Sequence, residues 1–440
     1  MSGLPSIAEL REVLMLESYN TRLVVLATTL LGIGAGLVGA FLLLRKRSLM
    51  GDVLSHATLP GIGIAFALGT TMAGGGKSLG ILLTGATLSG LAGVAVMLAI
   101  IRTTRLRDDV AMGFVLSVFF GAGTAILRMV QSLPNAAGLE SFIYGKTASM
   151  VSGDFTVIAV VSALSAIAVI LLLKELTVLC FDQGFAASEG WPVLLLDGVL
   201  LALVTAVTVV GLQAVGLILV IAFLIIPAAA ARFWTERLPV MLGLSAVIGG
   251  ISGWLGASIS ALLTDLPAGA LIVLTAAAIF AVSMIFGTAR GVLPRFLDQR
   301  RLQRRVGRQH LLRAAYEILE SKSRPPVNQP ISRAELLEHR SWTPHQLSRE
   351  LSRARGEDHL EPLADRTMVH LSESGFGEAS RITRNHRLWE LYLIRHADIA
   401  PSHVDRDADL VEHILGAEMV RALETELASR TQVPASPHRL

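Results

Sequence analysis

The sequence predicts an all-α protein that crosses a membrane several times, followed by a smaller polar domain of the α+β class. The 440 residues are 52% hydrophobic and only 17% charged, which is too apolar for a soluble protein of this length. The apolar residues fill about the first 290 positions, and the remainder has an ordinary polar composition. The net charge of +3 gives no general indication of nucleic-acid binding. The single cysteine, Cys180, excludes a disulfide framework.

About nine membrane spans can be marked, because a spanning helix needs about 20 consecutive apolar residues. They lie near residues 22–44, 52–69, 79–101, 110–129, 155–173, 192–211, 214–233, 240–262 and 269–286. We therefore expect a transmembrane domain over residues 22–286. Residues 1–21 carry Glu9, Arg11 and Glu12, so we expect an external segment there and not a cleavable signal peptide.

Basic residues between the spans predict the orientation of the chain, because short cytoplasmic loops collect Lys and Arg. Clusters follow the first, third, fifth, seventh and ninth expected spans. They are Arg45-Lys46-Arg47, then Arg102, Arg105 and Arg107, then Lys174, then Arg232 and Arg237, and finally the run from Arg290 to Arg308. All five fall on one side when the N-terminus is outside, so we expect the C-terminal domain to be cytoplasmic.

Three short motifs resemble nucleotide-binding sequences but lack the context that such sites need. Residues 34–39 (GAGLVG) match a dinucleotide fingerprint, yet they lie within a span and follow no strand. Small residues there predict close helix packing instead. Two phosphate-loop-like motifs, at 76–78 and 145–147, have Thr71 and Glu140 where a glycine is required. We therefore expect no bound nucleotide and no catalytic residue in this chain.

The stretch from Gly51 to Gly61 carries a carboxylate and an imidazole inside an expected span. Asp52 and His56 are four residues apart, so on a helix they share one face. An ionisable pair in a membrane is costly and marks an ion pathway by default. The alternative is an interfacial N-cap aspartate followed by an unrelated histidine. Carboxylate and imidazole suit Mn²⁺, Fe²⁺ or Zn²⁺, and two ligands fit a passing ion better than a structural one.

Residues 180–190 form a short amphipathic loop on the expected cytoplasmic side. It contains Asp182, and Ala186 and Gly190 lie one helical turn apart. Small residues at that spacing allow a helix to dock closely into the groove of a partner. A plain connecting loop is the alternative. Further along, Pro227 predicts a kink in the seventh span that frees backbone carbonyls.

Together these features resemble the permeases of ABC-type importers of manganese, zinc and iron. The resemblance covers about residues 20–290. It is carried by Gly51–Gly61, Asp109 at the start of the fourth span, Phe181-Asp182 with Ala186 and Gly190, and the run from Gly216 to Ala231. It implies a permease in the bacterial inner (plasma) membrane, paired with a second permease chain as a homo- or heterodimer.

The resemblance also implies two further partners. An external metal-binding protein would deliver the ion, and Asp52 and His56 would line its pathway. A separate cytoplasmic ATPase subunit would dock on the loop at 181–190 and hydrolyse the ATP.

The polar part begins with a basic connector whose arginines suit an anchor on anionic headgroups. A domain of about 125 residues follows, which is long enough for its own core. Its pattern predicts a helix at 310–321, a helix-turn-helix at 331–353 with Thr343 as an N-cap, and a wing strand at 367–371. We expect the connector at 287–309, a winged-helix-like domain at 310–376, a helical metal-binding and dimerisation-like region at 377–429, and a disordered tail at 430–440.

Candidate metal ligands in the polar part lie in two clusters. His386 and Glu390 are four residues apart, and Asp409, Glu412 and His413 follow at helical spacing. Such residues bind a divalent metal if the two helices meet. Polar surface helices also carry acid–histidine pairs at this spacing by chance, so the spacing leaves both interpretations open.

Residues 309–425 resemble metal-dependent repressors of the diphtheria-toxin-repressor and manganese-regulator type. The resemblance is carried by Tyr316-Glu317, the helix pair at 331–353, His386-Arg387-Leu388 with Glu390, and Glu412-His413. It implies a winged helix followed by a helical dimerisation region, with metal ligands where they join. By position the candidate ligands are His386, Glu390, Asp409, Glu412 and His413. His310 is a further candidate, because it stands where that family has its first-helix ligand, although the family has a different residue type there.

Two further positions limit this metal site. Arg313 stands where manganese-type members have an acid, which argues against a two-metal site of that kind. Either His403 or Asp405 is a further ligand candidate. The site is therefore predicted in outline only.

The second helix of the helix-turn-helix offers candidate contacts to DNA phosphates and base edges. They are Gln346, Ser348, Arg349 and Arg353. Because nearby acids dilute the charge and a membrane tether restricts access to a chromosome, we favour a metal-sensing, dimer-forming appendage. The predicted function is thus the permease of a divalent-metal importer, with manganese favoured over iron or zinc. The alternatives are a membrane-tethered, metal-responsive DNA-binding regulator and a secondary metal transporter without an ATPase.

Overall fold

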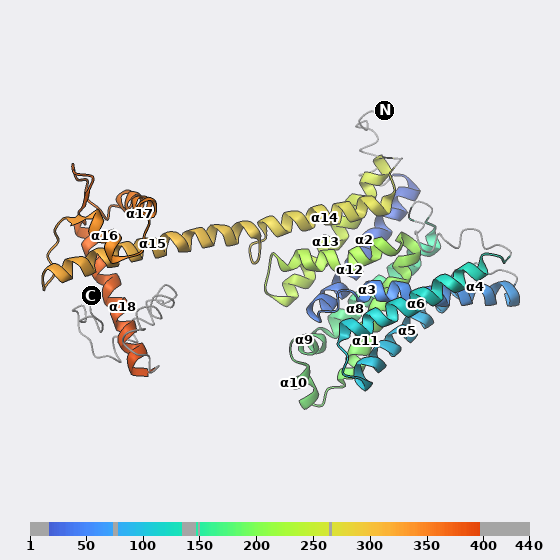
Figure 1. Ribbon diagram of the computed structural model, residues 1–440. Helices are drawn as coiled ribbons and strands as arrows, with labels where there is room; N and C mark the ends of the chain where they lie inside the picture. Colours follow the sequence, from blue (N-terminus) through green and yellow to red (C-terminus); the bar gives the residue numbers. More distant parts are fainter. Residues whose placement is uncertain (1–16, 74–77, 134–146, 148–149, 264–265, 397–440) are drawn as a thin grey trace. The chain divides into compact units, whose positions relative to one another are not determined.

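The computed structural model describes residues 17–73, 78–133, 147, 150–263 and 266–396. The chain divides into two compact units, Met1–Arg295 and Phe296–Leu440. The described part is mainly helical, as the sequence predicts (Figure 1).

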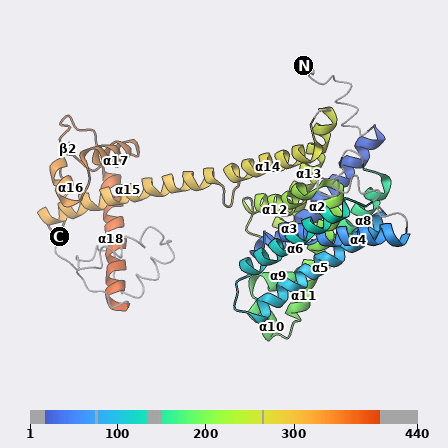
Figure 2. The same ribbon diagram turned by 45° about the vertical axis from the view of Figure 1, so that its right-hand side comes forward.

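The first unit is a bundle of helices, in which α4, α5 and α6 lie side by side in both views (Figure 1, Figure 2). Its helices are α2 (Tyr19–Leu44), α3 (Met50–Ala57), α4 (Leu59–Ala73), α5 (Leu79–Thr103), α6 (Asp108–Val130), α8 (Ser152–Leu171), α9 (Leu173–Phe181), α10 (Gln183–Ser188), α11 (Val193–Val215), α12 (Leu217–Arg232), α13 (Leu238–Leu262) and α14 (Ala268–Phe286).

Eight of the nine expected spans are long and apolar enough to cross a membrane, among the residues described. The expected seventh span, near 214–233, is the exception. Gly216 has a φ of +88° and separates α11 from α12, so α12 is only 16 residues long. At 1.5 Å per residue it spans about 24 Å, less than the hydrocarbon core of a bilayer. Phe223 and Leu224 of α12 are almost fully buried, so this short helix is enclosed by its neighbours.

The small residues of the GAGLVG motif serve helix packing. A Cβ atom on Gly36 would meet the backbone carbonyl of Ser245 in α13, and one on Gly39 would meet that of Leu224 in α12. Ser245 also donates its hydroxyl to the Gly36 carbonyl at 2.7 Å. This close approach of α2 to two helices is the packing that small residues permit in a membrane.

The second unit has its own apolar core around α15 (Val292–Lys322), α16 (Arg333–His339), α17 (Pro344–Gly356) and α18 (Glu373–His396). β1 (Ile331–Ser332) pairs antiparallel with β2 (Met368–Val369). Both short helices begin with capping boxes, formed by Ser332 with Glu335 and by Thr343 with Gln346. The helix-turn-helix and the wing strand therefore occur where the sequence pattern predicts them.

Candidate functional site

Helix α3 presents two polar side chains and buries everything else. All residues of Met50–Ala57 are buried except Asp52 and His56. Ser55 is also satisfied internally, because its hydroxyl donates to the Gly51 carbonyl at 2.7 Å. The open face of this helix thus consists of the predicted carboxylate and imidazole alone.

The two side chains contact each other as the i, i+4 spacing predicts. His56 Nε2 lies 3.3 Å from Asp52 Oδ1, and the side chains are 20% and 35% exposed. Asp52 lies in the first turn of α3 and His56 in the last. These positions favour a negative and a positive charge respectively, because of the helix dipole.

The two ring nitrogens of His56 have different surroundings, because Nε2 faces Asp52. Its Nδ1 is buried and has no hydrogen-bond partner among the described residues. The ring of Phe120 from α6 contacts the imidazole edge-on, with centroids 4.8 Å apart. Burial raises the pKa of the Cys180 thiol to about 12, so this cysteine stays protonated and is no thiolate ligand. A mixed oxygen and nitrogen donor pair suits Mn²⁺, Fe²⁺ or Zn²⁺.

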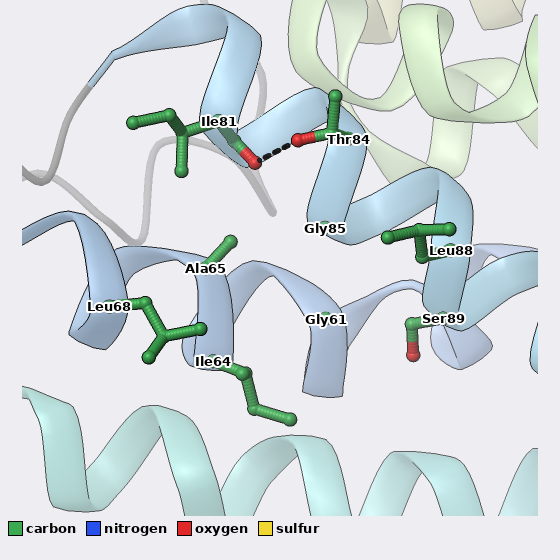
Figure 3. A pocket seen from close by; sticks show the side chains of 9 residues that line it. All are labelled: Gly61, Ile64, Ala65, Leu68, Ile81, Thr84, Gly85, Leu88 and Ser89. Atoms are coloured by element: carbon green, nitrogen blue, oxygen red, sulfur yellow. Dashed lines mark hydrogen bonds between the residues drawn. The ribbon is translucent and has the colours of Figure 1, made fainter.

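A separate apolar pocket lies between α4 and α5 (Figure 3). It has a volume of about 440 Å³ and is lined mainly by aliphatic side chains and glycines. Its two hydroxyl groups donate within the protein, from Thr84 to the Ile81 carbonyl and from Ser89 to the Ala57 carbonyl. With no carboxylate or imidazole in its lining, this pocket offers no ligand to a metal ion.

The predicted coupling loop is a short helix, α10, between Asp182 and Gly190. The Asp182 carboxylate caps it by accepting the Phe185 N–H at 2.8 Å. Gly190 has a φ of +78° at its end, a conformation that glycine adopts without strain. The Ala186 side chain is fully buried within the chain, so the surface of this segment is formed by other residues. The exposed apolar groups of the segment are Phe181 and Phe185.

Sequence reasoning missed a largely buried charged cluster beside α3. It consists of Arg45 and Arg47, which precede α3, Asp108 at the start of α6, and Asp197 in α11. The signal was present, because Asp197 is the one charged residue of the expected sixth span. An ionisable residue in a span is by default a functional candidate.

The second unit places three of its ligand candidates against arginine or carboxylate groups. Arg313 Nη1 lies 2.6 Å from Nδ1 and 2.8 Å from Nε2 of His386. His386 Nε2 is also 3.2 Å from Glu390 Oε1, and both side chains are 1% exposed. His310 Nδ1 contacts Arg340 Nη1 at 2.6 Å.

The other ligand candidates of this unit, Asp409, Glu412 and His413, lie outside the described residues. Within the described part, no three His, Cys, Asp or Glu side chains gather as a metal site. The described candidates therefore fit a metal ion poorly as they stand, because a guanidinium already contacts the His386–Glu390 pair.

The DNA-contact candidates lie on α17. Ser348 and Arg349 are exposed. Gln346 is engaged in the helix cap, where its Oε1 accepts the Thr343 N–H at 2.9 Å. Arg353 donates to Glu350 at 2.8 Å. Two of the four candidates thus already have intramolecular partners.

A bundle of apolar spans with an acid–histidine pair, joined to a winged-helix unit, defines a multi-pass membrane protein with an appended repressor-like domain. The chain belongs to the ABC 3 transport family, whose model matches residues 17–287. A second model, iron dependent repressor, metal binding and dimerisation domain, matches residues 372–439. Both predicted resemblances are thereby confirmed.

Named relatives cover one or both parts of the chain. The manganese transport system membrane protein MntC of Bacillus subtilis is 36% identical over 396 residues, covering 90% of this chain and 88% of that protein. The zinc transport system membrane protein TroC of Treponema pallidum is 45% identical over 290 residues, covering 66% and 96%. The solved structure of PsaBC from Streptococcus pneumoniae in complex with Fab matches with a TM-score of 0.57 at 30% identity, covering 67% and 100%.

Proposed function

We propose that this chain is the permease subunit of an ATP-driven importer of a divalent metal ion, with Asp52 and His56 lining the path of the ion. The names of the relatives support a metal cargo, with manganese, zinc and chelated iron all represented. Manganese is favoured because MntC is similar over both parts of the chain.

The observation that carries the proposal is the open face of α3. A carboxylate and an imidazole that lie 3.3 Å apart are the two side chains that this otherwise buried helix exposes. Two ligands hold a divalent ion weakly, and weak binding is what a conducting site needs for release. The ion itself is cargo and leaves after each transport cycle.

Uptake assays on two substitutions test this role. Asp52→Ala and His56→Ala should each abolish Mn²⁺ and Zn²⁺ uptake while leaving the protein in the membrane, because one remaining ligand binds a divalent ion poorly. A matched control is Asp298→Ala, which removes an exposed helical acid paired with Arg301 at 3.8 Å. Wild-type uptake in both variants would refute the pathway.

The partners follow from the same proposal. A separate ATPase subunit would bind the segment of α9 and α10, with Phe181 and Phe185 as exposed anchors. A second permease chain would complete the pathway, and an external metal-binding protein would load it. The basic clusters support an orientation in the bacterial plasma membrane with the second unit in the cytoplasm.

For the second unit we propose a metal-responsive appendage in which the ion and Arg313 compete for the His386–Glu390 pair. The contacts of Arg313 support the competition, and the family match to a metal-binding domain supports the ligand. Retention of DNA in a metal-dependent manner would favour the tethered-regulator alternative, for which the exposed Arg349 of α17 is the described candidate contact.

A further inference from the structure

A cluster of four charged side chains, three of them buried, lies beside the helix that carries the acid–histidine pair, and its fourth member, Asp108, is 42% exposed. Arg47 Nη1 donates to both carboxylate oxygens of Asp197, at 3.0 and 2.8 Å. Its Nε donates to Asp108 at 2.8 Å. Arg45 Nη2 donates to the same Asp197 at 3.0 Å. The side chains of Arg45, Arg47 and Asp197 are 9%, 8% and 8% exposed.

Arg45 connects this cluster to the coupling segment. Its Nη1 donates to the Leu179 carbonyl at 3.0 Å, near the end of α9, and lies 3.5 Å from Gln183 Oε1 in the first turn of α10. One guanidinium therefore contacts both helices that flank Asp182. The coupling segment and the cluster are in direct contact.

Arg47 connects the cluster to α3. Lys46, between the two arginines, has a φ of +58°, which is rare for a residue with a side chain and marks a tightly constrained turn. Helix α3 begins three residues after Arg47, and the Met50 N–H donates to the Arg47 carbonyl at 2.9 Å. A shift of Arg47 is therefore a shift of the first turn of α3, where Asp52 lies.

The shared carboxylate of Asp197 joins the two arginines in one charged cluster. Charges this deeply buried are tolerated only when they are paired, and breaking one pair leaves an uncompensated charge. Burial lowers the pKa of Arg47, but the charges of Asp197 and Asp108 more than offset this and hold that pKa above its ordinary value. Arg47 therefore keeps its charge, and its hydrogen bonds tie it to both Asp197 and Asp108.

We propose that the cluster of Arg45, Arg47, Asp108 and Asp197 transmits displacement of the α9–α10 segment to the Asp52–His56 pair. This inference rests on the proposed function, because it assumes that an ATPase drives that segment. The four residues are positioning residues, because they set the place of α3 and none of them belongs to the acid–histidine pair.

The test uses the full permease assembled with its ATPase subunit in vesicles, with Mn²⁺ as the probe. Asp197→Asn removes the shared charge, and Arg47→Gln removes the connection to α3. In both, we expect ATP hydrolysis per folded complex to persist while Mn²⁺ uptake per ATP falls about tenfold, an effect typical of residues that couple two sites. Arg47→Lys, which keeps the charge but loses the fork of donors, should fall between wild type and Arg47→Gln.

The matched control is Arg290→Gln, which breaks another two-pronged pair, to Glu236, on the surface of the same unit. It should leave uptake per ATP unchanged. Uptake and hydrolysis that fall in parallel with the amount of folded complex, or that stay at wild-type levels, would overturn the inference. If Arg47→Gln does not fold, Mn²⁺ uptake per ATP in Arg47→Lys alone tests the inference. If Asp52→Ala abolishes uptake while Asp197→Asn and Arg47→Gln keep normal uptake per ATP, the proposed ion pathway is supported and the proposed transmission by the cluster is refuted.

Discussion

Two acid–histidine pairs with i, i+4 spacing contact each other within the described residues, Asp52 with His56 and Glu390 with His386, and their surroundings are opposite. Asp52 and His56 lie on the open face of α3, beside the aromatic ring of Phe120. His386 and Glu390 lie fully inside the second unit, where the guanidinium of Arg313 contacts the imidazole. The spacing is therefore necessary for a metal site and does not define one.

The difference teaches what decides whether such a pair receives a cation. In the second unit, the guanidinium of Arg313 contacts His386 from within the chain. On α3, His56 contacts Asp52, and the described residues place no arginine or lysine against the pair. The first pair is open to a mobile cation, and the second already holds a fixed one.

The largest expected effect comes from giving the first pair the fixed cation of the second. Phe120→Arg would place a guanidinium where an aromatic ring now contacts His56. Its repulsion of a divalent ion amounts to about 8 kcal/mol at a separation of ~4 Å, twice the value for two unit charges, so we expect Mn²⁺ uptake to fall by more than about a thousandfold. Phe120→Leu is the control and should retain most uptake. A Phe120→Arg protein that inserts normally and transports would contradict the comparison.

The next effect concerns folding of the second unit. The carboxylate of Glu317 lies 3.0 Å from His339 Nε2 and 3.3 Å from Arg313 Nε. Burial raises its pKa, but the hydrogen bond with His339 and the charges of Arg313 and Arg340 outweigh this, so the pKa is lowered from 4.5. We expect Glu317→Gln to cost about 3 kcal/mol of unfolding free energy at pH 7, measured by calorimetry on the full chain.

The pH dependence of that difference has a definite sign. A carboxyl group whose folded pKa is lowered stabilises the fold fully above its ordinary pKa. The stabilisation is lost as the pH falls below 4.5 and through the lowered folded pKa. Wild type and Glu317→Gln should therefore converge in acid. An equal difference at pH 7 and at pH 3 would show that Glu317 acts by packing and not by charge.

Local spacing predicted part of this arrangement well. The contact of Asp52 with His56 is four residues in range, so helix geometry alone fixes it. The apolar runs predicted the spans in the same way, because hydropathy and helix length are properties of one segment. The helix at the seventh expected span is shorter than predicted, because Gly216 has a positive φ that ends the preceding helix inside an uninterrupted apolar run.

The contacts that surround each acid–histidine pair come from residues far away in the sequence, so they could not be predicted from local spacing. Arg313 and His386 are 73 residues apart in sequence, and Arg47 and Asp197 are 150 apart. No periodicity relates such positions. The burial of Ala186 is non-local in the same way, because a small residue suits packing inward as well as outward, and only its neighbours in the folded chain select the inward direction.

A smaller effect should follow from opening the second pair. Arg313→Ala removes the fixed cation from His386 and Glu390, so we expect the affinity of the second unit for Mn²⁺ or Zn²⁺ to rise about tenfold, or ~1.4 kcal/mol. Titration calorimetry on the full chain, with Asp52→Ala present to silence the first pair, measures this change. Arg313→Lys keeps the charge and should show no gain.

Adding His386→Ala and His413→Ala to the Arg313→Ala protein should remove the binding. If the metal affinity is the same with and without Arg313, this arginine does not compete with metal. That result would contradict the proposed difference between the two acid–histidine pairs.

The smallest expected effect is on the unfolding free energy, at an exposed ion pair whose hydrogen bonds are shorter than the contacts within either acid–histidine pair. Arg381 donates two hydrogen bonds to Glu378 on α18, at 2.6 and 2.8 Å, and thereby lowers the pKa of Glu378. The side chains are 64% and 24% exposed, and water and salt screen such pairs. Arg381→Ala should therefore change the unfolding free energy by only about 0.5 kcal/mol and leave metal affinity unaltered. A loss as large as that of Glu317→Gln would show that hydrogen-bond geometry, and not burial, makes a charged pair structural in this unit.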